Sequence, residues 1–148
     1  MLKKILLPVD NSEASEKAGE YAIRSAEITG TEIIVLHVID TYYLKSIPQH
    51  DLRERLEKQF RFEGKEAVEK FEKKIEDEQC AGNCKNIDLI TMIKEGKPSE
   101  VIVKTADQLG VDQIIMSKSG KHGLEKFLLG STTERVVREA KVPVNVIS

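Results

Sequence analysis

The sequence predicts an α/β fold, namely a three-layer, doubly wound sandwich around a five-stranded parallel sheet. Short apolar runs alternate along the chain with amphipathic stretches of helical length, and this alternation is typical of βαβ units. In the apolar run at residues 33–38 only His37 is polar, so a strand there must be covered on both faces. Right-handed crossovers between such strands give a doubly wound sheet, whose ligands bind beyond the carboxyl ends of the strands.

Length and charge limit the class of protein. The 148 residues suit one domain, residues 1–148, that buries its own core. With 23 Lys and Arg against 25 Asp and Glu, the net charge gives no reason to expect nucleic acid or an acidic membrane as a partner. The apolar run after Met1 is broken by Pro8 and Asp10, and no run approaches the length of a membrane span. We therefore expect a cytoplasmic protein.

The first part of the chain predicts two strands with a helix between them. Residues 4–9 are expected as the first strand and residues 32–39 as the second. The helix is capped by Asn11 or Ser12 and ends at Gly30. Its predicted buried stripe is Ala14, Ala18, Tyr21, Ala22 and Ile28.

A long charged helix is predicted over residues 51–79. Gly64 lies in its middle, and a glycine there costs about 1 kcal/mol relative to alanine, so we expect a weak point at which the helix could bend. The narrow apolar stripe of this helix is Leu52, Leu56, Phe60, Val68, Phe71 and Ile75.

The rest of the chain completes the alternation. A helix begins at Pro98, a residue suited to the first helical position, and ends at Gly110. The last helix is expected over residues 131–140. Three further strands are expected at residues 87–93, 111–116 and 142–147.

The segment between the fourth strand and the last helix is the most informative part of the chain. It runs from Ser117 to Ser131, contains Gly120 and Gly130, and carries several lysines. Glycines let main-chain N–H groups approach an anion, and the first turn of a helix offers unpaired donors. The segment therefore predicts a phosphate site, which would share one crevice with Asp10 if the first and fourth strands are neighbours.

Several catalytic and metal-binding patterns are absent from the sequence. There is no Gly-x-Gly-x-x-Gly after the first strand and no Gly-x-x-x-x-Gly-Lys-Ser/Thr, because Ile115 occupies the place of the required first glycine. Cys80 and Cys84 could form a small disulfide or half of a metal site, but two unpaired thiols are the simpler interpretation. We assign no catalytic residue and no protein metal site, and expect no efficient turnover.

The chain resembles the universal stress protein family over essentially its whole length. The motifs that carry the resemblance are Pro8-Val9-Asp10, Leu36-His37-Val38, Glu95-Gly96-Lys97-Pro98, the segment 120–131 and Pro143-Val144-Asn145-Val146. The resemblance implies an adenine-nucleotide hydrolase-like fold of the ATP-binding type. Many members bind ATP through Gly-x-x-Gly, nine residues, and Gly-Ser or Gly-Thr. Gly120, nine residues and Gly130-Ser131 match this spacing, whereas Ser117 replaces the first glycine.

The resemblance also implies roles for individual residues. Asp10 would accept from a ribose hydroxyl, the main chain of Val38 would pair with the adenine edge, and Gly120, Gly130 and Ser131 would hold phosphates. The full predicted site is Pro8, Val9, Asp10, Val38, Met116, Ser117, Lys118, Gly120, Lys121, Gly130, Ser131 and Thr132.

Structural alternatives accompany these roles. Asp10 could simply start a helix, and Ser131 with Glu134 has the spacing of a capping box. Glu134 would also repel a phosphate held at that helix start. If the backbone at Ser117 required a positive φ, the serine would carry a strain of about 1 kcal/mol. The lysines could be solvated surface residues, and His37 is expected to be a satisfied core residue.

The expected function is that of a cytoplasmic ATP-binding universal stress protein. It would act as a nucleotide-dependent switch or stress-tolerance factor, with ATP bound with or without Mg²⁺ and at most slowly hydrolysed. The resemblance implies a homodimer through the last strand, which starts at Val142 and ends at Ile147, and an apolar edge strand needs a partner. The alternative is a dimeric interaction module of the same fold that binds no nucleotide. The third possibility is a true enzyme of the wider hydrolase-like group, which is disfavoured because the sequence lacks a set of catalytic residues.

Overall fold

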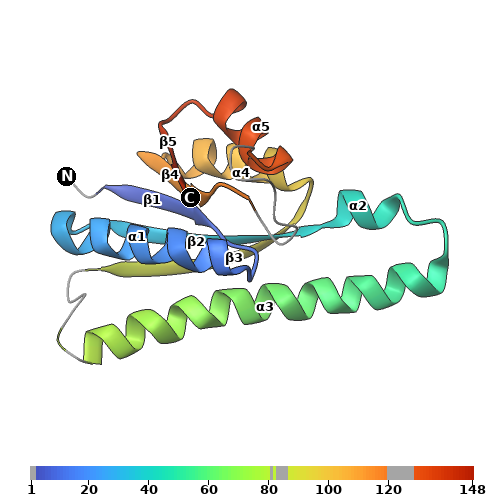
Figure 1. Cartoon of the computed structure of the whole chain (residues 1–148), viewed down its shortest axis with the longest axis horizontal. Helices are drawn as coiled ribbons and strands as arrows, with labels where there is room; N and C mark the ends of the chain where they lie inside the picture. The colour runs from blue at the N-terminus through green and yellow to red at the C-terminus, as the bar shows by residue number, and fades with distance from the viewer. Residues whose placement is uncertain (1–2, 81, 83–86, 120–128) are drawn as a thin grey trace.

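The computed structural model describes residues 3–80, 82, 87–119 and 129–148, and it confirms the predicted fold class (Figure 1). Five parallel strands form one sheet in the order β3-β2-β1-β4-β5. The order reverses between β1 and β4, which are neighbours as expected, so their carboxyl ends open a crevice there. The strands are β1 (Lys4–Pro8), β2 (Glu32–Asp40), β3 (Asp88–Gly96), β4 (Gln113–Ser117) and β5 (Val144–Ile147).

Helices cover both faces of the sheet and make the three layers. One face is covered by α1 (Glu13–Thr29) and α3 (His50–Cys80), and the other by α4 (Pro98–Leu109) and α5 (Ser131–Glu139). The short helix α2 (Thr41–Lys45) follows β2 directly, in a segment for which the sequence predicted no element. None of the helices in the described ranges is both long enough and apolar enough to cross a membrane.

The alternation of side chains along the strands builds two cores. Ile5 and Leu7 of β1 pack with α1 and α3, whereas Leu6 between them packs with α4 and α5. All three are at most 1% exposed. Because successive strand residues point to opposite faces, the dense apolar runs of the sequence fill both layers.

Helix α1 differs from its predicted packing. Ser12 is its N-cap, accepting from the Ser15 N–H at 3.1 Å, and Gly30 ends it with φ of 67°. Tyr21 and Ile28 were wrongly expected in the buried stripe, since they are 43% and 86% exposed. The helix packs against α3 as well as the sheet, so small residues occupy its contact face. The residues of α1 that are buried are Ser15, Ala18, Gly19, Ala22, Ile23 and Ala26.

Helix α3 is a single helix from His50 to Cys80, so the weak point expected at Gly64 does not interrupt it. Gly64 is buried against His37 of β2, and a Cβ there would lie 2.5 Å from the ring atom Cδ2 of His37. The glycine therefore permits close packing of the helix on the sheet. Val68, Phe71 and Ile75 of the predicted stripe lie in the main core.

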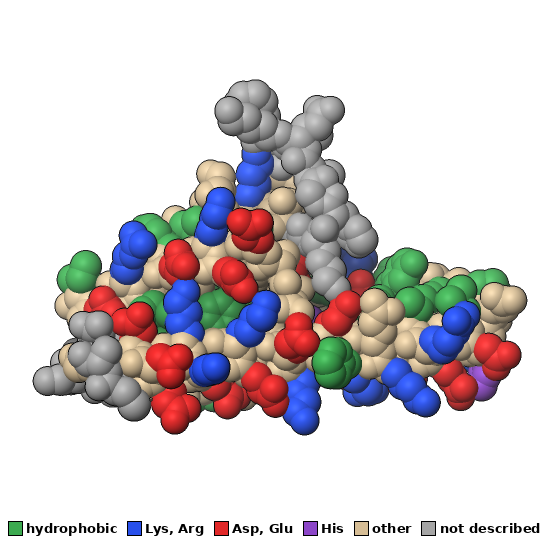
Figure 2. Space-filling view, turned by 60° about the horizontal axis from the view of Figure 1, so that its bottom comes forward, with side chains coloured by type: hydrophobic (Ala, Val, Ile, Leu, Met, Phe, Trp, Pro, Cys, Tyr) green, Lys and Arg blue, Asp and Glu red, His purple; other side chains and the backbone are tan. Residues whose placement is uncertain are grey.

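The first turns of α3 extend past the sheet and form an arm together with α2 (Figure 1). Its apolar residues make a separate cluster, in which Leu52, Leu56 and Phe60 are partly buried. Figure 2 shows hydrophobic side chains gathered over the end of this arm, and acidic and basic side chains interspersed along α3.

The strand bounds differ from their predictions by one to three residues, and the difference is largest in β3, β4 and β5. β4 runs from Gln113 to Ser117 instead of over residues 111–116. β3 continues to Gly96 because it pairs with β2 along its whole length, up to the partners Asp40 and Gly96. β5 begins at Val144, two residues later than expected.

Candidate functional site

A cleft of about 670 Å³ opens at the carboxyl ends of β1, β2 and β4. It lies where the strand order reverses, which is the usual ligand position in such sheets. The structure brings most of the predicted site residues together in its lining: Pro8, Val9, Asp10, Val38, Met116, Ser117, Gly130, Ser131 and Thr132.

The other predicted residues are placed differently. Lys118 is outside the lining, although its main chain shapes the site, because its carbonyl accepts from the Gly130 N–H at 2.9 Å. Gly120 and Lys121 lie outside the described residues, and so does Cys84.

The contacts of Asp10 are compatible with both of its predicted roles, as a residue that starts a helix and as an acceptor for a ligand. Its Oδ1 accepts from the N–H and the hydroxyl of Ser12, at 3.1 and 2.5 Å, and its own N–H donates to Ser15 Oγ at 3.2 Å. These bonds organise the start of α1. Among the described residues Oδ2 has no hydrogen-bond partner, so this oxygen can accept from a ligand in the cleft.

The start of α5 faces Asp10 across the cleft. The N-cap is Gly130 and it makes no side-chain capping bond, so the predicted capping box is wrong. Ser131 is instead the first helical residue, and Glu134 forms an ion pair with Arg138. Among the described residues, the N–H groups of Ser131, Thr132 and Thr133 have no carbonyl partner. These three donors, with the positive end of the helix dipole, make a site for an anion.

Ser117 carries no backbone strain. Asn11, with φ of 64°, is the one described non-glycine residue with a positive φ. The backbone of Ser117 therefore lacks the positive φ that would have caused strain. The Ser117 hydroxyl donates to the Ser119 carbonyl at 2.9 Å, and its carbonyl accepts from Thr133 Oγ1 at 2.9 Å. The serine therefore ties the end of β4 to the first turn of α5.

At the opposite end of the cleft, apolar side chains of β2 and α3 lie beside the carboxyl groups of Asp40 and Glu63. Val38 and Ile39 of β2 line it together with Phe60 of α3. The Phe60 ring stacks on Tyr43 of α2, with ring centroids 6.2 Å apart, and Lys97 Nζ lies 4.9 Å from the centroid of the Tyr42 ring. His37 is buried as expected, and its Nδ1–H donates to the Val9 carbonyl at 2.8 Å.

Sequence reasoning missed the part of the lining that comes from α3. Phe60 was assigned only to an apolar stripe, and Glu63 was not singled out, yet both line the cleft. Their position depends on how α3 lies across the end of the sheet. The spacing of Phe60 in the stripe was the only available signal.

The described lining is acidic. It contains the carboxyl groups of Asp10, Asp40, Glu63 and Glu134, and no Lys or Arg belongs to the described part of it. Gln59 donates to Glu63 at 3.1 Å, and Arg138 partly neutralises Glu134. An anionic ligand would therefore depend on the α5 donors and on a cation bound with it.

One group of side chains outside the cleft has the composition of a metal site. The ligand atoms of His50, Asp51 and Glu54, at the start of α3, lie within 4.8 Å of one another. All three are exposed, and none lines the cleft. Their contacts, 3.9 Å from His50 to Asp51 and 3.8 Å to Glu54, are those of surface ion pairs.

The sequence model of the universal stress protein family matches residues 1–148. The chain belongs to this family. Two relatives from Methanocaldococcus jannaschii illustrate the similarity. Universal stress protein MJ0531 is 33% identical over 99% of this chain and 82% of its own length. Universal stress protein MJ0577 is 34% identical over 99% of this chain and 95% of its own length.

Solved structures of the family agree with the fold. The structure of MJ0577 has a TM-score of 0.82 at 36% identity and covers 99% of this chain and 96% of that chain. A family member from Arabidopsis thaliana was solved with AMP bound, at 21% identity and a TM-score of 0.67, covering 98% of this chain and 90% of its own. Another was solved with cAMP, at 18% identity and a TM-score of 0.71, covering 99% of this chain and 97% of its own.

Proposed function

We propose that this chain is an ATP-binding universal stress protein that works as a nucleotide-dependent switch or stress-tolerance factor in the cytoplasm. It is a single domain over residues 1–148. One observation carries the proposal: the available Asp10 oxygen and the unpaired N–H groups of Ser131, Thr132 and Thr133 line the same cleft at the strand-order reversal. The AMP and cAMP complexes of related proteins support an adenine nucleotide as the ligand class.

The proposed ligand lies across the sheet edge from β2 to α5. The base occupies the end formed by β2 and α3, with its edge on the main chain of Val38, and a ribose hydroxyl donates to Asp10. The phosphates lie at the α5 start, against Gly130 and Ser131. Gly120, which is also proposed to hold phosphate, lies outside the described residues. Mg²⁺ accompanies the triphosphate, because the described lining is acidic and a magnesium ion lowers the charge that the site must accept.

Hydrolysis is slow at most in this proposal. Among the described lining residues, His37 donates Nδ1–H to a main-chain carbonyl inside the fold and Glu134 is paired with Arg138. A general base must lie within hydrogen-bond reach of the attacking water and have an available lone pair. Neither side chain is placed for that role. Of the other lining carboxylates, Asp10 is assigned to the ribose in this proposal, and Asp40 and Glu63 lie at the end formed by β2 and α3, away from the phosphates proposed at the α5 start.

Nucleotide binding is tested by calorimetry with MgATP and by the thermal shift that it produces. At a ligand concentration one hundred times Kd, the stabilisation is about 2.7 kcal/mol. Asp10→Asn keeps an oxygen for Ser12 but replaces the other carboxylate oxygen, which is proposed to accept from the ribose, by an amide nitrogen. ATP affinity should therefore fall about tenfold or more. Asp51→Asn, which removes an exposed carboxylate outside the cleft, should leave Kd unchanged. Equal ATP affinity in wild type and Asp10→Asn would contradict the assignment of Asp10.

We also propose a homodimer through β5. This strand forms one edge of the sheet, and all of its residues are half-buried. The carbonyls of Pro143 and Ile147 accept from Ile114 and Lys118, so the main-chain groups of Val144 and Val146, which alternate with them, face outward. Outward N–H and C=O groups are a template for pairing with a second copy.

The second candidate is a dimeric interaction module of the same fold that binds no nucleotide. The acidic lining of the cleft favours it, because four carboxyl groups repel a polyphosphate. An unchanged melting temperature across millimolar MgATP would favour this candidate over the first. Turnover above a few per minute would instead favour a true enzyme.

A further inference from the structure

Asp10 lies between two residues that helix α3 holds in place. We infer that α3 positions the Asp10 carboxylate, through Glu66 on one side and through Gly64 and His37 on the other. It thereby determines how strongly the cleft distinguishes ligands that carry sugar hydroxyls from ligands that lack them. This inference rests on the proposed function, since it concerns the residue that is proposed to accept from the ribose.

The residue after Asp10 is fixed by Glu66. Asn11 has a left-handed backbone, with φ of 64°, a conformation that asparagine tolerates better than most residues. Its Nδ2 donates to Glu66 Oε1 at 3.0 Å. Asn11 Oδ1 is buried without a hydrogen-bond partner among the described atoms. The charge-assisted bond to Glu66 is therefore the described hydrogen bond that fixes this side chain.

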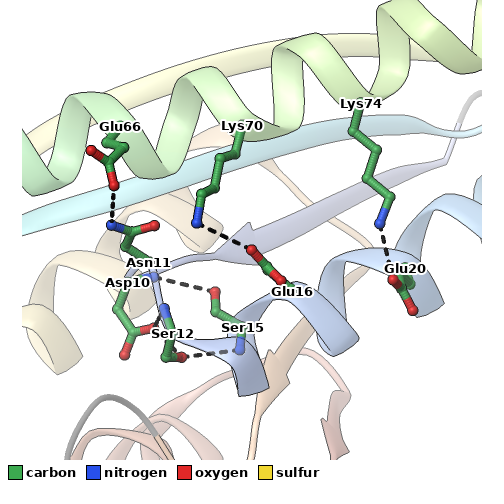
Figure 3. A network of polar contacts seen from close by, with 9 residues as sticks. All are labelled: Asp10, Asn11, Ser12, Ser15, Glu16, Glu20, Glu66, Lys70 and Lys74. Carbon is green, nitrogen blue, oxygen red and sulfur yellow. Dashed lines mark hydrogen bonds and ion pairs between the residues drawn. The ribbon is translucent and has the colours of Figure 1, made fainter.

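The opposite directions of the two neighbours matter for the site. Figure 3 shows Asn11 pointing to α3 and the Asp10 carboxyl group pointing away from it. A left-handed residue turns the chain sharply, so a change of φ at Asn11 would redirect Asp10. The bond from Asn11 to Glu66 thus acts on the cleft although neither residue lines it.

The residue before Asp10 is fixed by His37. The Val9 carbonyl accepts from His37 Nδ1–H at 2.8 Å. The imidazole itself lies against α3, because a Cβ on Gly64 would be 2.5 Å from Cδ2 and 2.9 Å from Nε2. Gly64 and Glu66 belong to the same turn of α3, so one turn of helix braces the chain on both sides of Asp10.

The same helix also forms one wall of the cleft, through Phe60 and Glu63. One helix therefore contacts both neighbours of Asp10, one of them through His37, and forms the wall that faces the ligand. Glu66, Asn11, His37 and Gly64 are positioning residues in this account, since they act through Asp10 and not by touching the ligand.

The test compares three variants in the full chain. Glu66→Ala removes the acceptor for Asn11, Glu66→Gln keeps an oxygen at that position, and Lys74→Ala is the matched control. Lys74 bonds Glu20 at 3.1 Å in the same contact between α3 and α1 (Figure 3), away from Asp10. Calorimetry gives Kd for MgATP and for 2′,3′-dideoxy-ATP, which lacks both ribose hydroxyls. The carboxyl ¹³C shift of Asp10 is measured in the nucleotide-free protein.

Wild type should bind MgATP about tenfold or more tightly than the dideoxy analogue, because the analogue leaves a polar group of the site without its partner. Glu66→Ala should lower this ratio to about threefold or less, mainly by weakening ATP, whereas Glu66→Gln and Lys74→Ala keep it. If Glu66→Ala only disturbed the fold, it would weaken the binding of both nucleotides equally.

The outcomes separate this inference from the proposed function. If wild type discriminates between the two nucleotides and Glu66→Ala keeps the ratio, α3 does not position Asp10 while nucleotide binding stands. If wild type binds no nucleotide, the proposed function fails, and the carboxyl ¹³C shift of Asp10 then tests whether α3 positions this side chain. A shift moved by Glu66→Ala but not by Lys74→Ala supports the positioning, and an unmoved shift overturns it.

Discussion

Gly19→Ala probes the contact between α1 and α3, where two opposing effects can be compared. Alanine in a helix interior is better than glycine by about 1 kcal/mol, so the substitution would normally stabilise α1. At Gly19, however, a Cβ would lie 1.9 Å from Cε1 and 2.3 Å from Cζ of Phe71. The Phe71 ring is 5% exposed and packed in the main core, so it has little room to move.

The steric effect should exceed the gain in helix propensity. Overpacking a core typically costs about 1 to 3 kcal/mol, and the short distances favour the upper end of that range. We expect a net loss of about 2 kcal/mol in the free energy of unfolding, measured in urea. For a domain of this size, the melting temperature should fall by roughly 4 to 8 °C.

A double-mutant cycle supplies the control. Phe71→Leu removes the two ring atoms nearest to Gly19, so in that background Gly19→Ala should be neutral or stabilising by up to about 1 kcal/mol. The two substitutions would then couple by about 2 to 3 kcal/mol. Equal effects of Gly19→Ala in both backgrounds, or a more stable single variant, would refute this packing of α1 on α3.

Three further predictions concern the α5 start, the sheet edge and an ion pair. Ser131→Pro should change the stability by no more than about 0.5 kcal/mol, because Gly130 already has an extended backbone and only an unpaired donor and a hydroxyl are lost. The same substitution should weaken the binding of MgATP in calorimetry. Ser131→Ala tests the hydroxyl alone, and unchanged affinity in both variants would count against the α5 site. Val146→Pro removes an outward N–H and should give a monomer in sedimentation with an unchanged circular dichroism spectrum, whereas a persistent dimer would exclude pairing through β5. The hydrogen bond and charge of Lys74 lower the pKa of Glu20, so the ion pair stabilises the fold above the usual pKa of a glutamate and stops doing so as the pH falls through the lowered pKa. Lys74→Ala should therefore lose at most about 0.5 kcal/mol at pH 7 in urea unfolding and almost nothing in acid, and an equal loss at both pH values would contradict this.

The layers of the fold could be predicted because their cause is local. The apolar runs that became β1, β2 and β4 are dense enough to require cover on both faces, and glycine at positions 30 and 110 ends helices with a positive φ. The placement of Asp10 opposite the last helix followed from general topology, since β1 and β4 are neighbours.

The errors arose where packing between distant segments decides the outcome. Ser131 and Glu134 have capping-box spacing, but α5 starts one residue earlier than that motif requires and Glu134 pairs with Arg138. Tyr21 fits the periodicity of a buried stripe, yet the contact with Phe71 rotates the buried face of α1 toward Gly19. Such contacts have no signature within either helix alone.

Phe60 takes part in two groups of contacts at once. It lines the cleft, and its ring stacks on Tyr43 in the arm outside the sheet. A side chain shared in this way makes occupancy of the cleft and the conformation of α2 thermodynamically linked, and such linkage is reciprocal. A molecule that binds the arm and changes the position of the Phe60 ring therefore changes the affinity of the cleft for its ligand. The ligand bound in the cleft changes the affinity of the arm for that molecule by the same factor.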